Sequence, residues 1–179
     1  MDKVKSVVRS VGNGNIKTFS KVLNILYVLI AILFVLDSLT KFEIKNQFLK
    51  SFVYMGLLIG APLILIGNLF IFKRKYQKLL ALFFPVMTII FILIVGPLKI
   101  LFSSSAWDTQ TILYQNRNLS FNRIEYQMQD VGSFGYNCRT VEVLYITRFF
   151  MIVDAVPNDI DKNVKWAKVN KDINQLNLR

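Results

Sequence analysis

The chain has 179 residues, of which 54 % are hydrophobic and 18 % charged, and its formal net charge is +11. Soluble domains contain roughly 45–50 % hydrophobic residues, so this composition argues against an ordinary soluble domain. The sequence has no histidine and one cysteine, which excludes histidine acid–base catalysis, histidine-ligated metal sites and a disulfide framework.

Residues 1–21 form a basic N-terminal segment. Valines recur there at helical spacing among the basic residues, and this pattern predicts one or two amphipathic turns on a membrane surface. Glycine and asparagine alternate at residues 12–15, which predicts a break in the helix. The valines are Val4, Val7, Val8 and Val11, and the basic residues are Lys3, Lys5, Arg9, Lys17 and Lys21. We expect anionic lipid headgroups at the cytoplasmic face as their partner.

Three apolar runs follow, at residues 22–39, 52–72 and 79–102. A helix rises about 1.5 Å per residue, so runs of this length match a hydrocarbon core of about 30 Å. Pro97 lies within the third run and predicts a kink there. The sequence therefore predicts a three-helix transmembrane domain over residues 22–102.

The distribution of basic residues predicts the orientation of these helices. Residues 1–102 contain 13 Lys and Arg against three acidic residues, whereas residues 103–179 contain nine against eight. Basic clusters precede the first run and separate the second from the third, so we expect a cytoplasmic N-terminus and an extracytoplasmic C-terminal domain. The Lys-, Asn- and Ile-rich composition indicates a bacterial inner membrane. Because the basic excess lies beside the spans, it argues against a nucleic-acid partner.

Small residues in the second span predict close helix packing. Gly56 and Gly60 form a GxxxG pair, and Gly67 follows one heptad after Gly60. Such residues let helix backbones approach closely. Packing against the chain's own helices is the favoured interpretation, and a homo-oligomer is the alternative.

Asp37 and Lys99 are the ionisable residues within the predicted spans. Both lie near the outer ends of their helices, where they could form an ion pair. Because charges in transport paths usually lie near the bilayer midplane, we favour an anchoring role. A channel or transporter subunit that uses these residues is the alternative.

Residues 103–179 predict a small α+β domain with an antiparallel sheet. Extended patterns occur at residues 109–115, 122–129, 139–147 and 149–156, and the second to fourth of these predict an antiparallel meander. The tail changes to helical spacing, which predicts an amphipathic C-terminal helix over residues 163–177. Its apolar face, the candidate partner surface, consists of Trp166, Val169, Ile173 and Leu176.

The chain lacks a recognisable catalytic constellation. Cys138 is the only thiol, and no histidine is present to activate it, so we expect a non-enzymatic protein without a metal or cofactor. We predict that the outer domain binds another protein. In architecture alone, the three spans resemble small bacterial immunity proteins that guard the inner membrane against pore-forming toxins. Immunity to a toxin and service as an accessory subunit of an envelope complex are the concrete candidates.

Overall fold

The chain divides into two compact units, which we describe separately. The computed structural model describes residues 2–157, 160 and 164–177, with side chains from Thr18 onward. The helical unit comprises residues up to 33 together with residues 55–100, and the sheet unit comprises residues 34–54 together with those from 101 onward. The end of the first helix and the start of the second therefore belong to the sheet unit.

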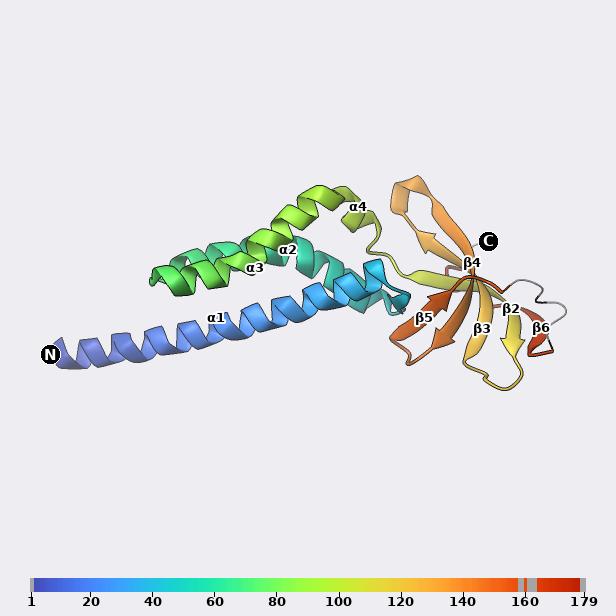
Figure 1. The fold of residues 1–179 in the computed structure, drawn as a ribbon, viewed down its shortest axis with the longest axis horizontal. Coiled ribbons are helices and arrows are strands. Elements are labelled where there is room, and N and C mark those ends of the chain that lie inside the picture. The colour runs from blue at the N-terminus through green and yellow to red at the C-terminus, as the bar shows by residue number, and fades with distance from the viewer. Residues whose placement is uncertain (1, 158–159, 161–163, 178–179) are drawn as a thin grey trace. The chain divides into compact units, whose positions relative to one another are not determined.

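Three long apolar helices occur where the sequence predicts three apolar runs (Figure 1). The described residues form the helices α1 (Asp2–Leu39), α2 (Gln47–Ile71), α3 (Lys75–Val95) and α4 (Pro97–Phe102). The segments Thr18–Leu39, Gln47–Ile71 and Lys75–Val95 are long and apolar enough to cross a membrane.

Two helix boundaries differ from the predictions. Helix α1 runs through residues 12–15 without a break, because a glycine costs a helix only about 1 kcal/mol and the segment leads directly into an apolar span. The side chains of the predicted amphipathic valines lie outside the described residues. The prediction of one helix over residues 79–102 is wrong, since α3 ends before Gly96, whose φ is +94°. Pro97 then starts α4, where its missing N–H costs no hydrogen bond.

The sheet unit contains one six-stranded antiparallel sheet in the order β1-β5-β4-β3-β2-β6. Its strands are β1 (Phe42–Ile44), β2 (Trp107–Asn116), β3 (Asn122–Asp130), β4 (Tyr136–Tyr145), β5 (Phe150–Asp154) and β6 (Trp166–Asp172). Consecutive strands β2 to β5 are neighbours, which confirms the predicted antiparallel meander. Strand β1 comes from the loop between the first two spans and was not predicted.

The predicted C-terminal helix over residues 163–177 is wrong, because this segment forms β6 and pairs with β2. Asn170, Asn174 and Asn177 have φ of +46°, +46° and +53°. Asparagine tolerates this left-handed region better than most residues, and a right-handed helix cannot contain it. The helical spacing of the apolar residues was therefore coincidental, and the hydrogen bonds to β2 determine the structure.

The polar side of β3 lies inside the sheet unit. Glu125, Gln127 and Gln129 are buried, with exposed fractions of 1 %, 0 % and 6 %. Hydrogen bonds attach neighbouring segments to this part of the sheet. The residues just before β2 are held on two sides, since the Ala106 N–H donates to the Gln47 side chain and the Gln129 side chain donates to the Ser105 carbonyl. Residues 173–175 donate to the backbone of β2. A small apolar cluster, Val143, Met151 and Val153, completes the interior. This polar interior positions the candidate site.

Candidate functional site

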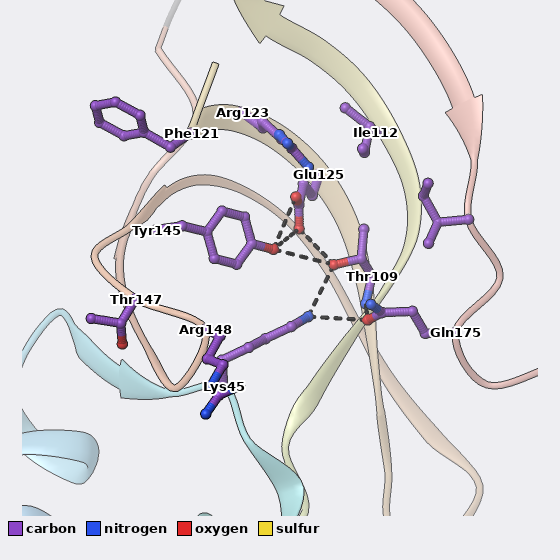
Figure 2. Close-up of a pocket in the computed structure, with 11 residues that line it drawn as sticks. Lys45, Thr109, Ile112, Phe121, Arg123, Glu125, Tyr145, Thr147, Arg148 and Gln175 are labelled. Carbon is purple, nitrogen blue, oxygen red and sulfur yellow. Dashed lines mark hydrogen bonds between the residues drawn. The ribbon is translucent and has the colours of Figure 1, made fainter. Parts of the chain in front are cut away.

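A pocket of about 350 Å³ opens on the sheet unit beside the buried carboxylate of Glu125 (Figure 2). Strands β2, β3 and β4 supply its floor, the loop after β1 supplies Lys45, and the C-terminal segment supplies Gln175. Its charged and polar lining comprises Lys45, Thr109, Arg123, Glu125, Tyr145, Thr147, Arg148 and Gln175. All of these residues belong to the sheet unit.

Three protein groups donate hydrogen bonds to Glu125. The Tyr145 hydroxyl lies 2.8 Å from Oε2 and 3.0 Å from Oε1, and the Thr109 hydroxyl lies 2.7 Å from Oε2. The amide of Gln127 donates to Oε2 at 3.1 Å. A buried carboxylate needs such donors, because an unpaired one would cost several kcal/mol. Glu125 is therefore a fixed structural charge at the floor of the pocket.

Lys45 joins three parts of the sheet unit. Its Nζ donates to the Trp107 carbonyl at 3.2 Å, to the Thr109 hydroxyl at 3.0 Å and to the Gln175 side chain at 3.1 Å. Figure 2 shows this chain of hydrogen bonds running from Lys45 through Thr109 to Glu125. An ammonium has three protons, so the protein already uses all of the Lys45 donors.

Burial favours the neutral form of both Tyr145 and Lys45, the titratable neighbours of Glu125 in the pocket. Burial and the charge of Glu125 raise the pKa of Tyr145 above its ordinary value, so its hydroxyl remains a donor at neutral pH. Burial lowers the pKa of Lys45, although Glu125 and Asp108 oppose that shift.

Arg123 and Arg148 have donors to spare at the rim of the pocket. Arg123 donates its Nε to the Ser120 carbonyl at 3.0 Å and lies over the Tyr145 ring at 5.8 Å. Arg148 is exposed and lies 4.7 Å from the Phe149 ring. Within the described part of the chain, no acceptor meets the terminal nitrogens of either guanidinium. With Lys45, the lining carries three positive charges against the single carboxylate, so it favours an anionic group.

A partly buried ion pair connects two strands of the sheet. Arg139 donates to Glu43 through both terminal nitrogens, at 2.7 and 2.6 Å, and lies 4.0 Å over the Trp107 ring. It also donates to the side-chain oxygen Oε1 of Gln127 at 2.9 Å. Bidentate pairs of this kind add geometric specificity as well as stability. Because Glu43 is in β1 and Arg139 in β4, the pair holds these two strands together on the polar side of the sheet.

Asp37 has partners that the sequence analysis did not name. Its Oδ2 lies 3.3 Å from Lys50 Nζ and accepts the Tyr54 hydroxyl at 2.6 Å, while its Oδ1 accepts the Ile44 N–H at 2.6 Å. All four residues belong to the sheet unit. Lys99 is exposed in α4, in the helical unit.

The three glycines predicted to mediate helix packing have different surroundings. A Cβ added at Gly60 would lie 3.0 Å from the Tyr27 ring, and one added at Gly56 would lie 3.3 Å from Ile30. A Cβ at Gly67 would meet nothing within 4 Å. Gly56 and Gly60 are thus the positions where α2 lies close to α1 within the helical unit.

The predicted partner surface is not one apolar helical face. Trp166 is buried at the start of β6, whereas Val169 is 41 % exposed. Ile173 lines the pocket beside Gln175, and Leu176 is half-buried after the strand. Cys138 is exposed on β4. In the described part of the chain, no group of three or more Cys, Asp and Glu side chains could hold a metal ion.

No family model, curated protein or solved structure matches the chain.

Of the pocket residues, sequence reasoning named only Ile173, as part of the predicted partner surface. The one available signal was the alternation of charged and amide residues on β3, which resembles an ordinary solvent-facing side. Lys45 and Gln175 lie 130 positions apart in the sequence, and no local pattern connects them.

Proposed function

We propose that the chain is a membrane-anchored binding protein whose sheet unit captures an acidic group of a protein partner. The observation that carries this proposal is the pair of guanidinium groups, Arg123 and Arg148, whose terminal donors have no acceptor among the described residues at the rim of a pocket. The buried residues beneath them hold the pocket in a fixed shape.

The membrane part of the proposal rests on the helices and on charge. Three helices are long and apolar enough to span a bilayer, and the basic clusters lie before the first span and between the second and third. The positive-inside rule then puts the N-terminus in the cytoplasm and the sheet unit outside. A bacterial inner membrane is the proposed location.

The chemistry of the rim favours a carboxylate or a similar anion. Arginine binds planar anions through two parallel N–H donors. Glu125 does not cancel this preference, because Tyr145, Thr109 and Gln127 already donate to it.

The surroundings of the pocket favour a protein partner over a small molecule. The pocket is near the lower limit of about 300 Å³ for small-molecule sites. Phe121 lines it and is 47 % exposed, and Leu119 and Ile146 in the neighbouring turns are 42 % and 52 % exposed. Aromatic residues and arginine are enriched in protein interfaces. The ends of the β2–β3 and β4–β5 hairpins therefore form the proposed contact surface.

Two biological roles fit such a protein: immunity to a membrane-targeting toxin, and service as an accessory subunit of an envelope complex. The identity of the captured partner would distinguish these two roles. The three donors around Asp37 favour an anchoring role for this residue over a place in a transport path.

Affinity purification in mild detergent tests the proposal. Tagged full-length protein, the Arg123→Gln/Arg148→Gln variant and the Lys168→Gln/Lys171→Gln variant are compared by mass spectrometry. The control pair removes the same charge from exposed positions of β6 that do not line the pocket. We expect a stoichiometric partner with the wild type and the control, and its loss from the arginine variant.

Retention of the partner by the arginine variant would reject the pocket as the binding site. Recovery of the wild-type chain alone, or only as a homo-oligomer, would reject the binding function itself.

A further inference from the structure

A second pocket, of about 720 Å³, lies within the helical unit between α1 and α3. Its walls are mainly apolar and include Ile25 and Leu29 from α1 and Leu80 and Phe84 from α3. Ile25, Leu29 and Leu80 are each at least half exposed. Because the helices are long and apolar enough to span a bilayer, these side chains would face lipid chains.

The mouth of this pocket is cationic. Lys21 and Arg74 line it, both are exposed, and no Asp or Glu is among its lining residues. Lys21 lies near the start of the first candidate span, and Arg74 lies between the end of the second span and the start of the third. Both charges therefore belong to the same end of the spans, at the level where headgroups would lie. No acceptor for either side chain occurs among the described residues.

A network of amides forms a rigid floor near the mouth. Asn24 lines the pocket, donates to Asn68 Oδ1 at 3.0 Å and accepts from Asn68 Nδ2 at 2.9 Å. Asn68 also donates to the Ala81 carbonyl at 2.8 Å. These bonds tie α1, α2 and α3 together beside the pocket, so its shape does not depend on an occupant.

We propose that this pocket is a binding site for one anionic phospholipid. The phosphate would lie at Lys21 and Arg74, and one acyl chain would lie along the apolar wall of α1 and α3. The charge at the mouth selects an anionic headgroup over a neutral one, and the length of apolar wall selects an amphiphile over a soluble phosphate. Under the orientation proposed above, the lipid belongs to the cytoplasmic leaflet.

Native mass spectrometry of the detergent-purified full-length protein tests this site. Phosphatidylglycerol, phosphatidylcholine and soluble glycerol phosphate are added separately to the wild type, to Lys21→Gln/Arg74→Gln and to Lys73→Gln/Lys75→Gln. The second pair is the matched control, because it removes two charges from the residues on either side of Arg74, which do not line the pocket.

We expect the wild type to retain one phosphatidylglycerol in preference to phosphatidylcholine, and to retain no glycerol phosphate. One basic residue near a membrane surface contributes roughly a fivefold change in affinity, about 1 kcal/mol. The Lys21→Gln/Arg74→Gln variant should therefore lose about 25-fold in affinity for phosphatidylglycerol. The control should keep the one-to-one adduct and lose no more than a few fold.

Three results would overturn the proposal. Equal losses in both variants would indicate a general surface charge without a site. Equal retention of the two lipids by the wild type would indicate a groove that any acyl chain fills. A dimer without a lipid adduct would indicate that a second copy covers this face.

Discussion

Removal of the Lys50 ammonium should strongly destabilise the protein, because Asp37 would keep a buried charge without its counter-ion. The two side chains are 5 % and 0 % exposed, and Lys50 Nζ lies 3.3 Å from Asp37 Oδ2. Breaking one side of a buried pair typically costs about 3–5 kcal/mol. We therefore expect Lys50→Met to lower the free energy of unfolding by about this amount.

The double variant Asp37→Asn/Lys50→Met identifies the cause of the loss. Asparagine keeps an oxygen for the Ile44 N–H, which Asp37 Oδ1 accepts at 2.6 Å, and it removes the unpaired charge. We expect the double variant to recover more than half of the stability lost in Lys50→Met, measured by reversible unfolding in detergent.

The exposed pair of Lys41 and Asp154 is the matched control. Their side chains are 65 % and 51 % exposed, and solvent screens such pairs, so Lys41→Met should leave unfolding unchanged within error. If Lys50→Met were as stable as Lys41→Met, the argument that Asp37 is an anchoring charge would be refuted.

Three further predictions concern packing, titration and topology. Gly60→Ala should destabilise the protein by about 1–3 kcal/mol because its Cβ would lie 3.0 Å from a tyrosine ring, whereas Gly67→Ala should be tolerated. Because the folded state raises the pKa of Tyr145 above its usual value of about 10, this residue stabilises the fold below pH 10. That contribution should be lost as the pH rises through the folded pKa, and Tyr145→Phe should lack this alkaline loss. In intact cells, a membrane-impermeant maleimide should label the exposed Cys138.

Each of these measurements has a direct control. Thermal unfolding in detergent compares the two glycine variants, and equal losses would contradict the packing argument. Subtracting the pH profile of Tyr145→Phe from that of the wild type removes the contribution of the other titrating groups, and identical profiles would contradict the assignment. For topology, a Cys138→Ser/Tyr76→Cys variant should be labelled only after permeabilisation, and labelling before it would reverse the proposed orientation.

Hydropathy and alternation predicted the larger elements of the fold. The three long apolar helices and the meander of β3 to β5 follow from periodic patterns that extend over many residues. The two wrong helix predictions, over residues 79–102 and 163–177, failed at residues with a positive φ. Gly96 adopts a positive φ before Pro97 and divides the third run, and asparagines at positive φ exclude a helix at the C-terminus.

The candidate sites could not be predicted because their residues meet only in the folded chain. Glu125 looked like part of a solvent-facing side, but it is buried with donors from β2 and β4. The sequence analysis considered an ion pair of Asp37 with Lys99. In the structure, the chain turns back after α1 and Lys50 forms an ion pair with Asp37. The predicted partner surface failed for the same reason, since Trp166 packs inside.

Site-specific photo-crosslinking in living cells tests the central claim most directly. A photoreactive phenylalanine analogue replaces Phe121 at the pocket in one strain and Val169 on β6 in another, because both side chains are exposed to a similar extent, 47 % and 41 %. Our account predicts a discrete protein adduct at Phe121 that disappears when Arg148→Gln is added, and none at Val169. An adduct at Val169 alone, or one at Phe121 that survives Arg148→Gln, would contradict it.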